Sequence, residues 1–343
     1  MTEKKTLTIH DIARLADVSP TTVSFVLNER KGISDETRSR VQGIIEQTGF
    51  TPNIHTRRLN LKKSFNVSVV MQEQASSLHN MYFLEIIFGI LSEGNKLGYN
   101  ILFATLANES DRELLLGTIN NKSTDGLIFL EDMDPDTLSI VKESGIPHLV
   151  VDSHLRDKGV YPQVQFDYFE ASFAATEYLI KAGHEQIAFI SMKQSPDYYT
   201  STFEGYKTAL LRYGLHLEPT WVQSDASDET SAAGCMRNIL ESDSARPTAV
   251  FCAGDIYAVG AMKCAKEYGL SVPGDISFIG IDDLILSPYI DPPLTTMSVN
   301  ERLMGQTAMQ MMYDILNGMP GAPATTITGT IIERASVKRL AKT

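Results

Sequence analysis

Short polar side chains, together with one proline and one phenylalanine, are concentrated in one stretch near the start of the chain. The stretch contains Ser19, Pro20, Thr21, Thr22, Ser24, Phe25 and Asn28. Hydroxyl and amide groups of this size can hydrogen-bond to base edges or phosphates without filling the major groove of a DNA duplex. The composition therefore predicts a DNA-reading surface, and the alternative is a generic unit of three helices that binds no nucleic acid.

Capping patterns predict the helices that would position this surface. Thr8 with Asp11 forms a capping-box pattern, and Ser19 followed by Pro20 is typical of the start of a second helix. Ser34 begins a third helix, with acidic residues in its first turn. The residues expected to face inward are Ile9, Ile12, Ala13, Ala16, Val23, Val26, Leu27, Val41, Ile44 and Ile45. The spacing fits a helix-turn-helix, whose second helix enters a major groove.

Charge is unevenly distributed along the chain. Residues 1–64 hold 11 of the 30 Lys and Arg and 7 of the 42 Asp and Glu, a balance of +4 in a chain of formal net charge −12. A basic segment on an acidic body is the electrostatic pattern of a protein that meets nucleic acid at one end. Chance fluctuation over a short segment is the alternative explanation.

Residues 51–64 read as a linker. They contain Arg57, Arg58, Lys62 and Lys63 but few apolar residues, and Asn53 is a candidate helix cap after Pro52. We therefore expect a segment that becomes helical only when it docks.

From about residue 65, short apolar runs alternate with helical patterns. Strands are expected at 66–71, 99–104, 125–130, 146–151, 185–191, 248–253 and 276–282. Helices are expected at 81–97, 110–120, 134–144, 168–183, 199–214, 228–241 and 254–269. A late strand and helix lie within 295–316, and 324–337 reads as one final strand. This alternation predicts α/β architecture with parallel sheets covered on both faces, and the number of units predicts two lobes.

Three aspartates come at the ends of apolar strands in this body. They are Asp152, Asp255 and Asp282. Ligands of parallel sheets bind at the carboxyl ends of the strands, so these residues are candidates for a small-molecule site. Asp255 is the weaker candidate, because it can instead cap the helix that follows it.

Several function classes lack support in the sequence. No apolar run approaches the roughly 18 residues of a membrane helix, and the first residues do not resemble a signal peptide. No glycine-rich nucleotide loop, G-x-S-x-G or HExxH motif is present, so we expect no cofactor and no enzyme activity. The three cysteines lack metal-ligand spacing and read as reduced thiols of a cytoplasmic protein. We expect His184 to be a packing or capping residue rather than a base.

Several blocks of the sequence resemble the lactose-repressor (LacI) family of bacterial transcription regulators and occur in the family's order. They are TIHDIARLADVSPTTVSFVLN, ISDETRSRV, GFTPN, LNLKKS, NMYFLEIIFGILSEGNKLGYNILF, TDGLIF, GIPHLVVD, LIKAGHEQIAFI, FEGYKTAL, VPGDISFIGIDD and PPLTTMSV. The resemblance covers essentially residues 6–338.

The resemblance implies a helix-turn-helix headpiece (1–50), a hinge helix (51–64) and a two-lobed body (65–343) like that of type I periplasmic binding proteins. It implies a cytoplasmic transcription regulator that acts as a repressor. The protein would bind a pseudo-palindromic operator in double-stranded DNA as a homodimer. A small-molecule effector, such as a carbohydrate or a derivative, would bind between the lobes and gate operator affinity. A solute-binding receptor of the same body fold is the alternative. No leucine-heptad tail follows the last strand, so we expect a dimer rather than a tetramer.

By this match, positions that meet DNA lie at or beside Ser19, Pro20, Thr21, Thr22, Ser24 and Phe25. Thr8 and Asn28 are further candidates for contacts in the major groove or to phosphate. Phe25 departs from the family pattern, because many members carry arginine there. An aromatic ring cannot make the bidentate contact to guanine, although it can press on a thymine methyl group. We therefore expect an operator with weak guanine demand opposite Phe25. The alternative is that Phe25 packs into the headpiece core.

The hinge positions carry over in the same way. Leu59 matches the leucine that wedges between base steps from the minor groove, or packs against the partner's hinge. Thr56 replaces a common alanine, and Asn53 and Arg57 are further hinge candidates, with Arg57 able to contact phosphate.

Residues of the effector cleft also carry over. Tyr82 and Phe83 match an aromatic pair at the cleft, with two core aromatics as the alternative, and Asp282 matches a ligand-binding position. At other cleft positions, later in the chain, the residue type differs from the one common in the family.

The departures concern side chains that usually grip the effector. Thr202 stands where many members have arginine, Ala226 where an aromatic often stacks, and Gly254 where asparagine is frequent. Tyr198 and Tyr199 could supply stacking from another side. The resemblance thus implies a roomier and less charged pocket, a different effector, or a cleft poorly adapted to any ligand.

Overall fold

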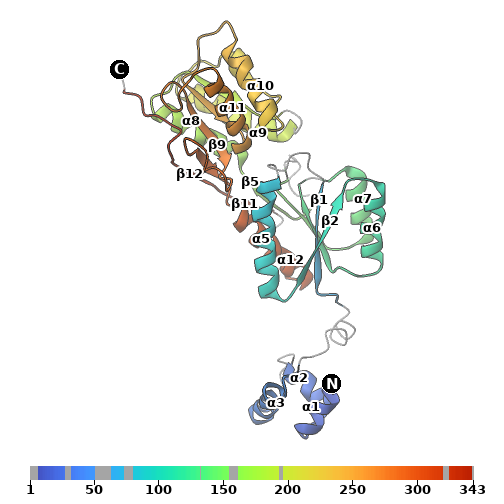
Figure 1. Cartoon of the computed structure of the whole chain (residues 1–343). Helices are drawn as coiled ribbons and strands as arrows, with labels where there is room; N and C mark the ends of the chain where they lie inside the picture. The colour runs from blue at the N-terminus through green and yellow to red at the C-terminus, as the bar shows by residue number, and fades with distance from the viewer. Residues whose placement is uncertain are drawn as a thin grey trace, which may run out of the picture. The chain divides into compact units, whose positions relative to one another are not determined.

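The computed structural model consists of two compact units, Met1–Ser64, termed the headpiece unit, and Phe65–Thr343, termed the body (Figure 1). It describes residues 7–27, 32–50, 63–72, 80–131, 133–153, 161–192, 196–319 and 324–341. Five residues predicted to meet DNA lie outside the described residues: Asn28, Asn53, Thr56, Arg57 and Leu59.

Three helices form the described part of the headpiece unit, as the capping patterns predict. They are α1 (Ile9–Leu15), α2 (Pro20–Leu27) and α3 (Asp35–Thr48). Their core is built from Ile12, Ala13, Ala16, Val23, Val26, Val41 and Phe50. The stripes expected to face inward therefore do so, with Ile9, Leu27, Ile44 and Ile45 packed partly buried around this core.

The predicted caps are confirmed atom by atom. The backbone N–H of Asp11 donates to Thr8 Oγ1 at 3.3 Å, and that of Thr8 donates to Asp11 Oδ2 at 3.0 Å, which completes a capping box. The backbone N–H of Thr22 donates to Ser19 Oγ at 3.0 Å. Ser34 caps α3 through the N–H of Thr37 at 3.3 Å. These side chains satisfy donors that a helix start otherwise leaves without a partner.

The first sheet of the body is parallel, with the strand order β11-β5-β4-β3-β1-β2. The strands are β1 (Asn66–Gln72), β2 (Asn100–Leu106), β3 (Gly126–Leu130), β4 (His148–Val151), β5 (Gln163–Phe166) and β11 (Ala324–Ile327). Two helix pairs cover its faces: α5 (Asn80–Leu97) with α12 (Glu301–Leu316), and α6 (Glu109–Asn120) with α7 (Pro135–Ser144) (Figure 1). We term this half the N-terminal lobe.

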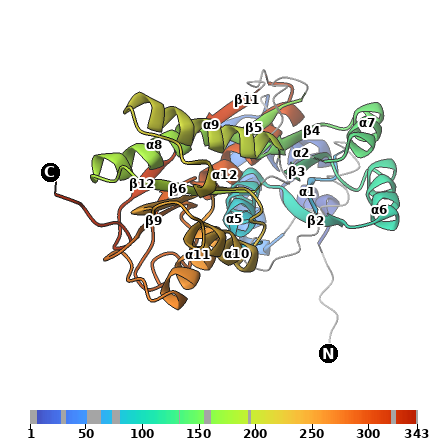
Figure 2. The same cartoon turned by 90° about the horizontal axis from the view of Figure 1, so that it is seen from above.

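The second sheet has the order β12-β10-β9-β8-β6-β7, parallel except for the β10–β12 pair. Its strands are β6 (Ile187–Ile190), β7 (Val222–Gln223), β8 (Ala249–Cys252), β9 (Ser277–Asp282), β10 (Thr295–Ser298) and β12 (Thr330–Ile332). Helices α8 (Tyr168–Lys181) and α9 (Pro196–Arg212) lie on one side, and α10 (Glu229–Leu240) and α11 (Asp255–Glu267) on the other (Figure 2). This half is the C-terminal lobe.

Alternating burial explains why the strands read as continuous apolar runs. In β3, Ile128 and Leu130 join the core under α5 and α12, whereas Leu127 and Phe129 join the core under α6 and α7. A strand covered on both faces needs apolar side chains at every position. The predicted α/β class with two parallel sheets is thus confirmed.

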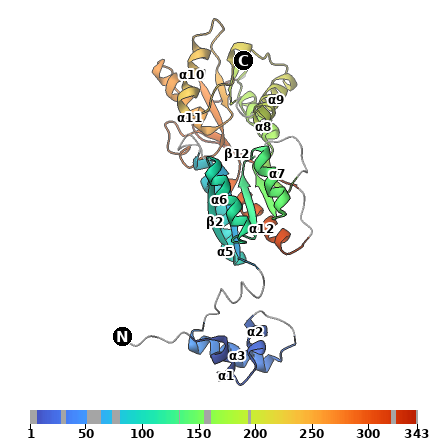
Figure 3. The same cartoon turned by 90° about the vertical axis from the view of Figure 1, so that its right-hand side faces the viewer.

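The chain passes between the lobes three times, from β5 to α8, from β10 to α12 and from β11 to β12. Figure 3 shows α5, α6, α7 and α12 in one lobe and α8, α9, α10 and α11 in the other. The third passage corrects one prediction. The apolar pattern of 324–337 is not one strand, because β11 pairs with β5 in the N-terminal lobe and β12 pairs with β10 in the C-terminal lobe. Gly329 lies between them, and a Cβ there would meet the Ser298 carbonyl oxygen at 2.0 Å and the Phe166 ring at 3.0 Å. Glycine therefore lets the three passages pack closely.

Candidate functional site

The outer face of α2 is the surface that the sequence assigns to DNA. Val23 and Val26 are buried in the headpiece core, while Ser19 and Thr21 are exposed. Pro20, Thr22, Ser24 and Phe25 are each partly exposed on the same short helix. The structure thus keeps all six predicted side chains at the surface of the unit.

Three hydroxyl groups predicted to meet DNA, those of Thr8, Ser19 and Thr22, are engaged in local structure. Ser19 Oγ lies 2.9 Å from Thr22 Oγ1, and Thr8 Oγ1 donates to Asp11 Oδ2 at 2.7 Å. Phe25 is partly exposed, and the buried aromatic residue of the described headpiece core is Phe50. Contact with a thymine methyl group requires part of the Phe25 ring to be exposed.

The second site is a cavity of about 50 Å³ between the two sheets of the body, with room for only a few water molecules. It is lined by Tyr82, Glu131, Asp152, Tyr168, Met192, Tyr198, Ala253, Gly254, Ile256, Tyr257, Asp282 and Leu284. Four of the effector-site candidates meet here, namely Tyr82, Asp152, Tyr198 and Asp282. They come from α5, the end of β4, α9 and the end of β9.

Asp152 is the centre of a hydrogen-bond network in this cavity. The hydroxyl of Tyr82 donates to Asp152 Oδ2 at 2.8 Å, and that of Tyr168 donates to Oδ1 at 3.0 Å. The two hydroxyl oxygens lie 3.2 Å apart. Since Tyr168 begins the first helix of the C-terminal lobe and Asp152 follows a strand of the N-terminal lobe, the network joins the lobes.

Tyr198 lines the cavity next to Tyr168. Its ring meets that of Tyr168 edge to face, with centroids 4.8 Å apart, and its hydroxyl donates to the Ala253 carbonyl oxygen. Burial raises the pKa of Tyr82, Tyr168 and Tyr198 well above the ordinary value, with nearby carboxyl groups adding to the rise. These phenols therefore remain protonated hydrogen-bond donors.

Carboxyl groups dominate the electrostatics of the cavity. Burial raises the pKa of Asp282 well above its ordinary value, and the carboxyl groups of Asp255, Glu301 and Asp152 raise it further. Burial likewise raises the pKa of Asp255 to about 7 and that of Glu301 to about 8. Each of these groups is disfavoured as an anion because it is removed from water and surrounded by charge of its own sign.

Four effector-site candidates do not line the cavity. Phe83 is 2% exposed and packs in the core, with its ring edge-on to Tyr82 at 5.2 Å. The hydroxyl of Thr202 donates back to the carbonyl of Tyr198 at 3.0 Å, inside its own helix. Ala226 is fully buried in the core of the C-terminal lobe. Asp255 is fully buried and is not among the described residues that line the cavity.

Asp255 holds a loop in place rather than capping a helix. Its carboxylate accepts from the Leu284 backbone N–H at 3.0 Å, the Ser287 hydroxyl at 2.5 Å and the Thr296 hydroxyl at 2.5 Å. It is the first residue of α11, and no side-chain cap is formed at that helix start. The capping alternative is therefore wrong, and the network instead ties α11 to the segment between β9 and β10.

Several residues of the cavity wall were not predicted from the sequence, among them Glu131, Tyr168 and Tyr257. Glu131 directly follows β3, so the strand-end argument that selected Asp152 applied to it as well. Tyr168 gave no such signal, because the preceding strand β5 is short and contains two glutamines.

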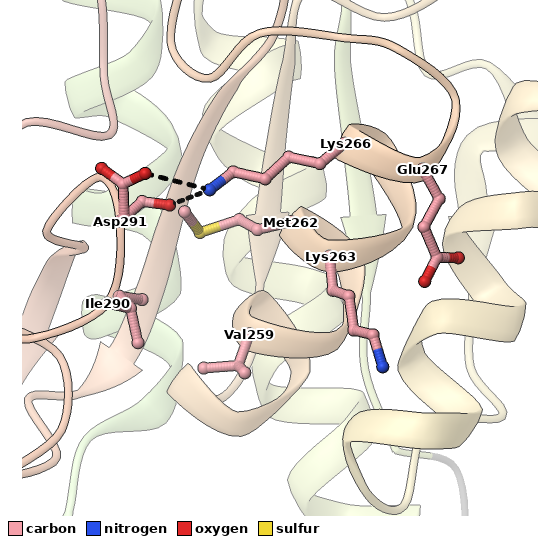
Figure 4. A pocket seen from close by; sticks show the side chains of 7 residues that line it. All are labelled: Val259, Met262, Lys263, Lys266, Glu267, Ile290 and Asp291. Atoms are coloured by element: carbon pink, nitrogen blue, oxygen red, sulfur yellow. Dashed lines mark hydrogen bonds and ion pairs between the residues drawn. The ribbon is translucent and has the colours of Figure 1, made fainter.

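A second hollow of about 420 Å³ lies open on the outside of the C-terminal lobe. Figure 4 shows it between α11 and the segment before β10, lined by Val259, Met262, Lys263, Lys266, Glu267, Ile290 and Asp291. The Lys266 ammonium donates to the Asp291 carbonyl oxygen and lies 3.5 Å from Asp291 Oδ2. This is a shallow surface groove rather than an enclosed site.

The remaining candidates for chemistry have structural roles. The ring nitrogens of His184 lie 3.0 Å from Thr248 Oγ1 and 3.0 Å from the Lys338 carbonyl oxygen, and burial lowers its pKa. Cys235, Cys252 and Cys264 are buried free thiols. Among the described residues, no cluster of His, Cys, Asp or Glu fits a metal ion, and no helix is long and apolar enough to cross a membrane.

Comparison with known proteins relates both units to characterised families. Residues 8–53 match the family described as bacterial regulatory proteins, lacI family, and residues 176–337 match the periplasmic binding protein-like domain. The HTH-type transcriptional repressor PurR of Erwinia tasmaniensis is 33% identical over 335 residues, which cover 96% of each chain. That relative is a transcriptional repressor rather than an enzyme.

Two solved structures resemble the whole chain. The lac repressor dimer bound to operator and the anti-inducer ONPF has a TM-score of 0.74 and 25% identity, and covers 97% of this chain and 100% of its own. The complex of the transcriptional regulator CelR with cellobiose has a TM-score of 0.73 and 25% identity, with 96% and 99% covered. Family match, relative and fold agree: the chain belongs to the lacI family of bacterial regulatory proteins.

Proposed function

We propose that the protein represses transcription by binding a pseudo-palindromic operator through its headpiece unit, and that a small molecule bound between the lobes gates this binding. The observation that carries the proposal is the combination, in one chain, of a surface-exposed polar helix α2 and a two-lobed body with a cavity at its strand ends. Its solved relatives are bound to operator and ONPF in one case and to cellobiose in the other. A repressor needs both parts, whereas a solute receptor needs only the body.

The α2 surface supports DNA reading on physical grounds. Thr21, Thr22 and Ser24 present hydroxyl groups at the surface of a helix narrow enough to enter a major groove. Ser19 caps that helix, which fixes the position of its first turn. By family match, the hinge residues Asn53, Thr56, Arg57 and Leu59 add contacts in the minor groove. The protein would carry out this role in the cytoplasm, without an enzymatic reaction.

Gating follows from the position of the cavity. A ligand shifts an equilibrium between two arrangements of the lobes only if it binds one arrangement more tightly. Tyr82, Asp152 and Tyr168 line the 50 Å³ cavity and are hydrogen-bonded to one another, so a larger effector has to part the lobes or displace such side chains. Parting the lobes would change the three chain segments that pass between them.

We propose a homodimer as the DNA-binding species. Several large apolar side chains are exposed on the body: Leu84 and Phe88 on α5, Leu102 and Phe103 on β2, and Ile285 and Tyr289 before β10. Contact with a second copy would remove this apolar surface from water. In sedimentation, we expect a dimer that Phe88→Glu weakens, while Leu211→Glu, at a position 64% exposed on α9, leaves it intact.

Operator selection from random duplexes tests the DNA-binding proposal. The full chain should enrich a site with two related half-sites, and its affinity should fall steeply as salt rises, because phosphate contacts release counterions. Thr21→Glu adds a carboxylate to the exposed face of α2 and should weaken binding about tenfold or more. Gln47→Glu adds the same charge at an exposed position on α3 and serves as the matched control.

Two outcomes would contradict the proposal. One is a selection that returns no motif preferred over bulk DNA. The other is Thr21→Glu binding the selected site as tightly as the unmodified chain does.

A further inference from the structure

Tyr168 stands at the first passage of the chain between the lobes. It follows β5 after one intervening residue and begins α8, the first helix of the C-terminal lobe. The start of that helix is fixed by Asp167, whose Oδ1 accepts from the backbone N–H of Glu170 at 3.1 Å. The Tyr168 side chain is 7% exposed and lines the cleft cavity. It therefore lies both at a passage between the lobes and in the wall of the cavity.

The side chain of Tyr168 contacts both lobes. Its hydroxyl donates to Asp152 Oδ1 at 3.0 Å, at the end of β4 in the N-terminal lobe. Its ring meets that of Tyr198, on α9 of the C-terminal lobe, with centroids 4.8 Å apart and ring planes at 71°. A rotation of one lobe against the other therefore has to break the hydrogen bond or separate the two rings.

Tyr168 also packs against the place where the three passages meet. The Phe166 ring is edge-on to the Tyr168 ring, with centroids 5.1 Å apart. A Cβ on Gly329, in the third passage, would lie 3.0 Å from the Phe166 ring and 2.0 Å from the carbonyl oxygen of Ser298, where the second passage begins. Because contacts this close leave no space to absorb a shift, displacement of Tyr168 is passed to residues of all three passages.

Tyr82 shares most of these properties but differs in its position. Its hydroxyl donates to the same carboxyl group, at Asp152 Oδ2, over 2.8 Å, and its side chain is 8% exposed in the same cavity. Tyr82 and Asp152 both belong to the N-terminal lobe, so their bond does not depend on how the lobes are arranged. Of these two bonds, only that of Tyr168 changes when the lobes move.

We propose that Tyr168 is the positioning residue that couples the cleft cavity to the arrangement of the lobes: its bond to Asp152 holds the closed arrangement, and an effector that displaces its side chain releases the lobes. This inference rests on the proposed effector role of the cleft and identifies the side chain through which that role is exerted. It requires no charge on the effector, because the side chain is displaced by volume. A ligand moves the lobes only through such a difference in contacts between two arrangements.

Distances between the lobes test the inference on the full chain. Nitroxide labels at Leu114→Cys on α6 and Leu211→Cys on α9, positions that are 69% and 64% exposed, report the separation of the lobes. The three native cysteines are buried, and an excess of unlabelled chain leaves only label pairs within one chain. By pulsed electron resonance we expect Tyr168→Phe to raise the share of a second distance about tenfold, because a buried hydrogen bond between the lobes is lost. An unchanged distance distribution overturns the inference.

Tyr82→Phe is the matched control, because it removes a phenol from the same carboxyl group within one lobe. Its distance distribution should match that of the labelled chain without further substitution. Equal shifts in Tyr82→Phe and Tyr168→Phe overturn the inference. Asp152→Asn weakens the acceptor of the bond between the lobes and should shift the distances in the same direction as Tyr168→Phe. That variant decides the matter if Tyr168→Phe fails to fold.

A larger side chain in the cavity wall imitates a bound effector. Ala253 is fully buried and lines the cavity, so Ala253→Leu fills space there. We expect Ala253→Leu to raise the share of the second distance, and to raise it no further in a chain that also carries Tyr168→Phe, because coupled substitutions are not additive. Independent effects of the two substitutions, or no shift by Ala253→Leu, contradict the coupling.

Operator binding by the unmodified chain separates the two proposals. Operator preference with no lobe shift in Tyr168→Phe leaves the proposed function standing and refutes the coupling. A lobe shift in Tyr168→Phe without operator preference refutes the proposed function instead.

Discussion

The hydroxyl of Tyr168 donates to Asp152 Oδ1 at 3.0 Å, and this bond joins the first helix of the C-terminal lobe to the end of a strand in the N-terminal lobe. Asp152 is 2% exposed and also accepts from Tyr82. The two phenols thus hold a buried carboxyl group at the point where the lobes meet. A ligand entering the cavity has to compete with these bonds.

Removing the Tyr168 hydroxyl should destabilise the body. Tyr168→Phe deletes the donor but keeps the ring, so we expect the free energy of unfolding to fall by about 1–3 kcal/mol, as for a buried hydrogen bond to a charged group. Tyr213→Phe is the matched control, because that hydroxyl donates to Glu177 at 2.7 Å on the exposed surface. In denaturant unfolding, Tyr168→Phe should lose more free energy of unfolding than Tyr213→Phe. Equal losses would show that the buried Tyr168 hydrogen bond contributes no more than the exposed one.

Close packing of α5 against α12 should be sensitive to a single methyl group. A Cβ on Gly305 would lie 2.0 Å from the Ile86 carbonyl oxygen and 2.9 Å from the Ile90 backbone nitrogen. Gly305→Ala should therefore force the helices apart and cost about 1–3 kcal/mol or more. Gly117→Ala, on α6 with open space around it, should instead stabilise by up to about 1 kcal/mol. A neutral Gly305→Ala in thermal unfolding would mean that the two helices separate easily.

The raised pKa of Glu301 predicts that the folded protein becomes less stable as pH rises. An unfolded glutamate loses its proton near pH 4, at about 4.3, whereas Glu301 keeps its proton in the fold up to about pH 8. Between these values the folded state binds more protons, so the free energy of unfolding falls as pH rises. Glu301→Gln cannot titrate, and its stability relative to the unmodified chain should increase from about pH 5 to about pH 8.

Glu143→Gln, at an exposed position of α7, is the control for this titration. Like Glu301→Gln, this variant replaces a carboxyl group with an amide, but it does so at the protein surface. Parallel profiles for Glu301→Gln and Glu143→Gln would rule out the titration of Glu301 as the cause.

Phe25 predicts a specific property of the operator. Phe25→Arg places a bidentate donor where the ring stands, and should create a guanine preference worth about 1–3 kcal/mol at the facing base pair. The unmodified chain should show no such requirement in a selection from random duplexes. A strongly required guanine opposite Phe25 in the unmodified chain would refute this reading of the α2 face.

The sequence predicted well where a local rule applies. The caps Thr8, Ser19 and Ser34 are formed by side chains only three residues from the groups that they satisfy, so a short window contains all the information. The apolar runs marked the strands that are buried on both faces. Strand β5 was not predicted, because Gln163 and Gln165 interrupt its apolar pattern. Both side chains are nevertheless buried in the sheet, at 2% and 7% exposure.

The cleft was only half predictable for a related reason. Asp152 and Asp282 follow strands, and strand ends are visible in the sequence. Tyr82 and Phe83 are adjacent aromatic residues on the same helix. Tyr82 lines the cavity, whereas Phe83 is buried in the core. Asp255 also follows a strand, but its carboxyl group hydrogen-bonds to Ser287 and Thr296, which are distant in sequence, and it does not line the cavity.

The amino-acid sequence alone determined the three described helices of the headpiece unit, the alternation of strands and helices, and the polar face of α2, because capping and periodicity act over a few residues. Only the tertiary structure decided which residues share the cleft and that residues 324–337 divide between two sheets. Those choices depend on contacts between segments far apart in the chain. The free energy of such contacts comes from burial that no local pattern records.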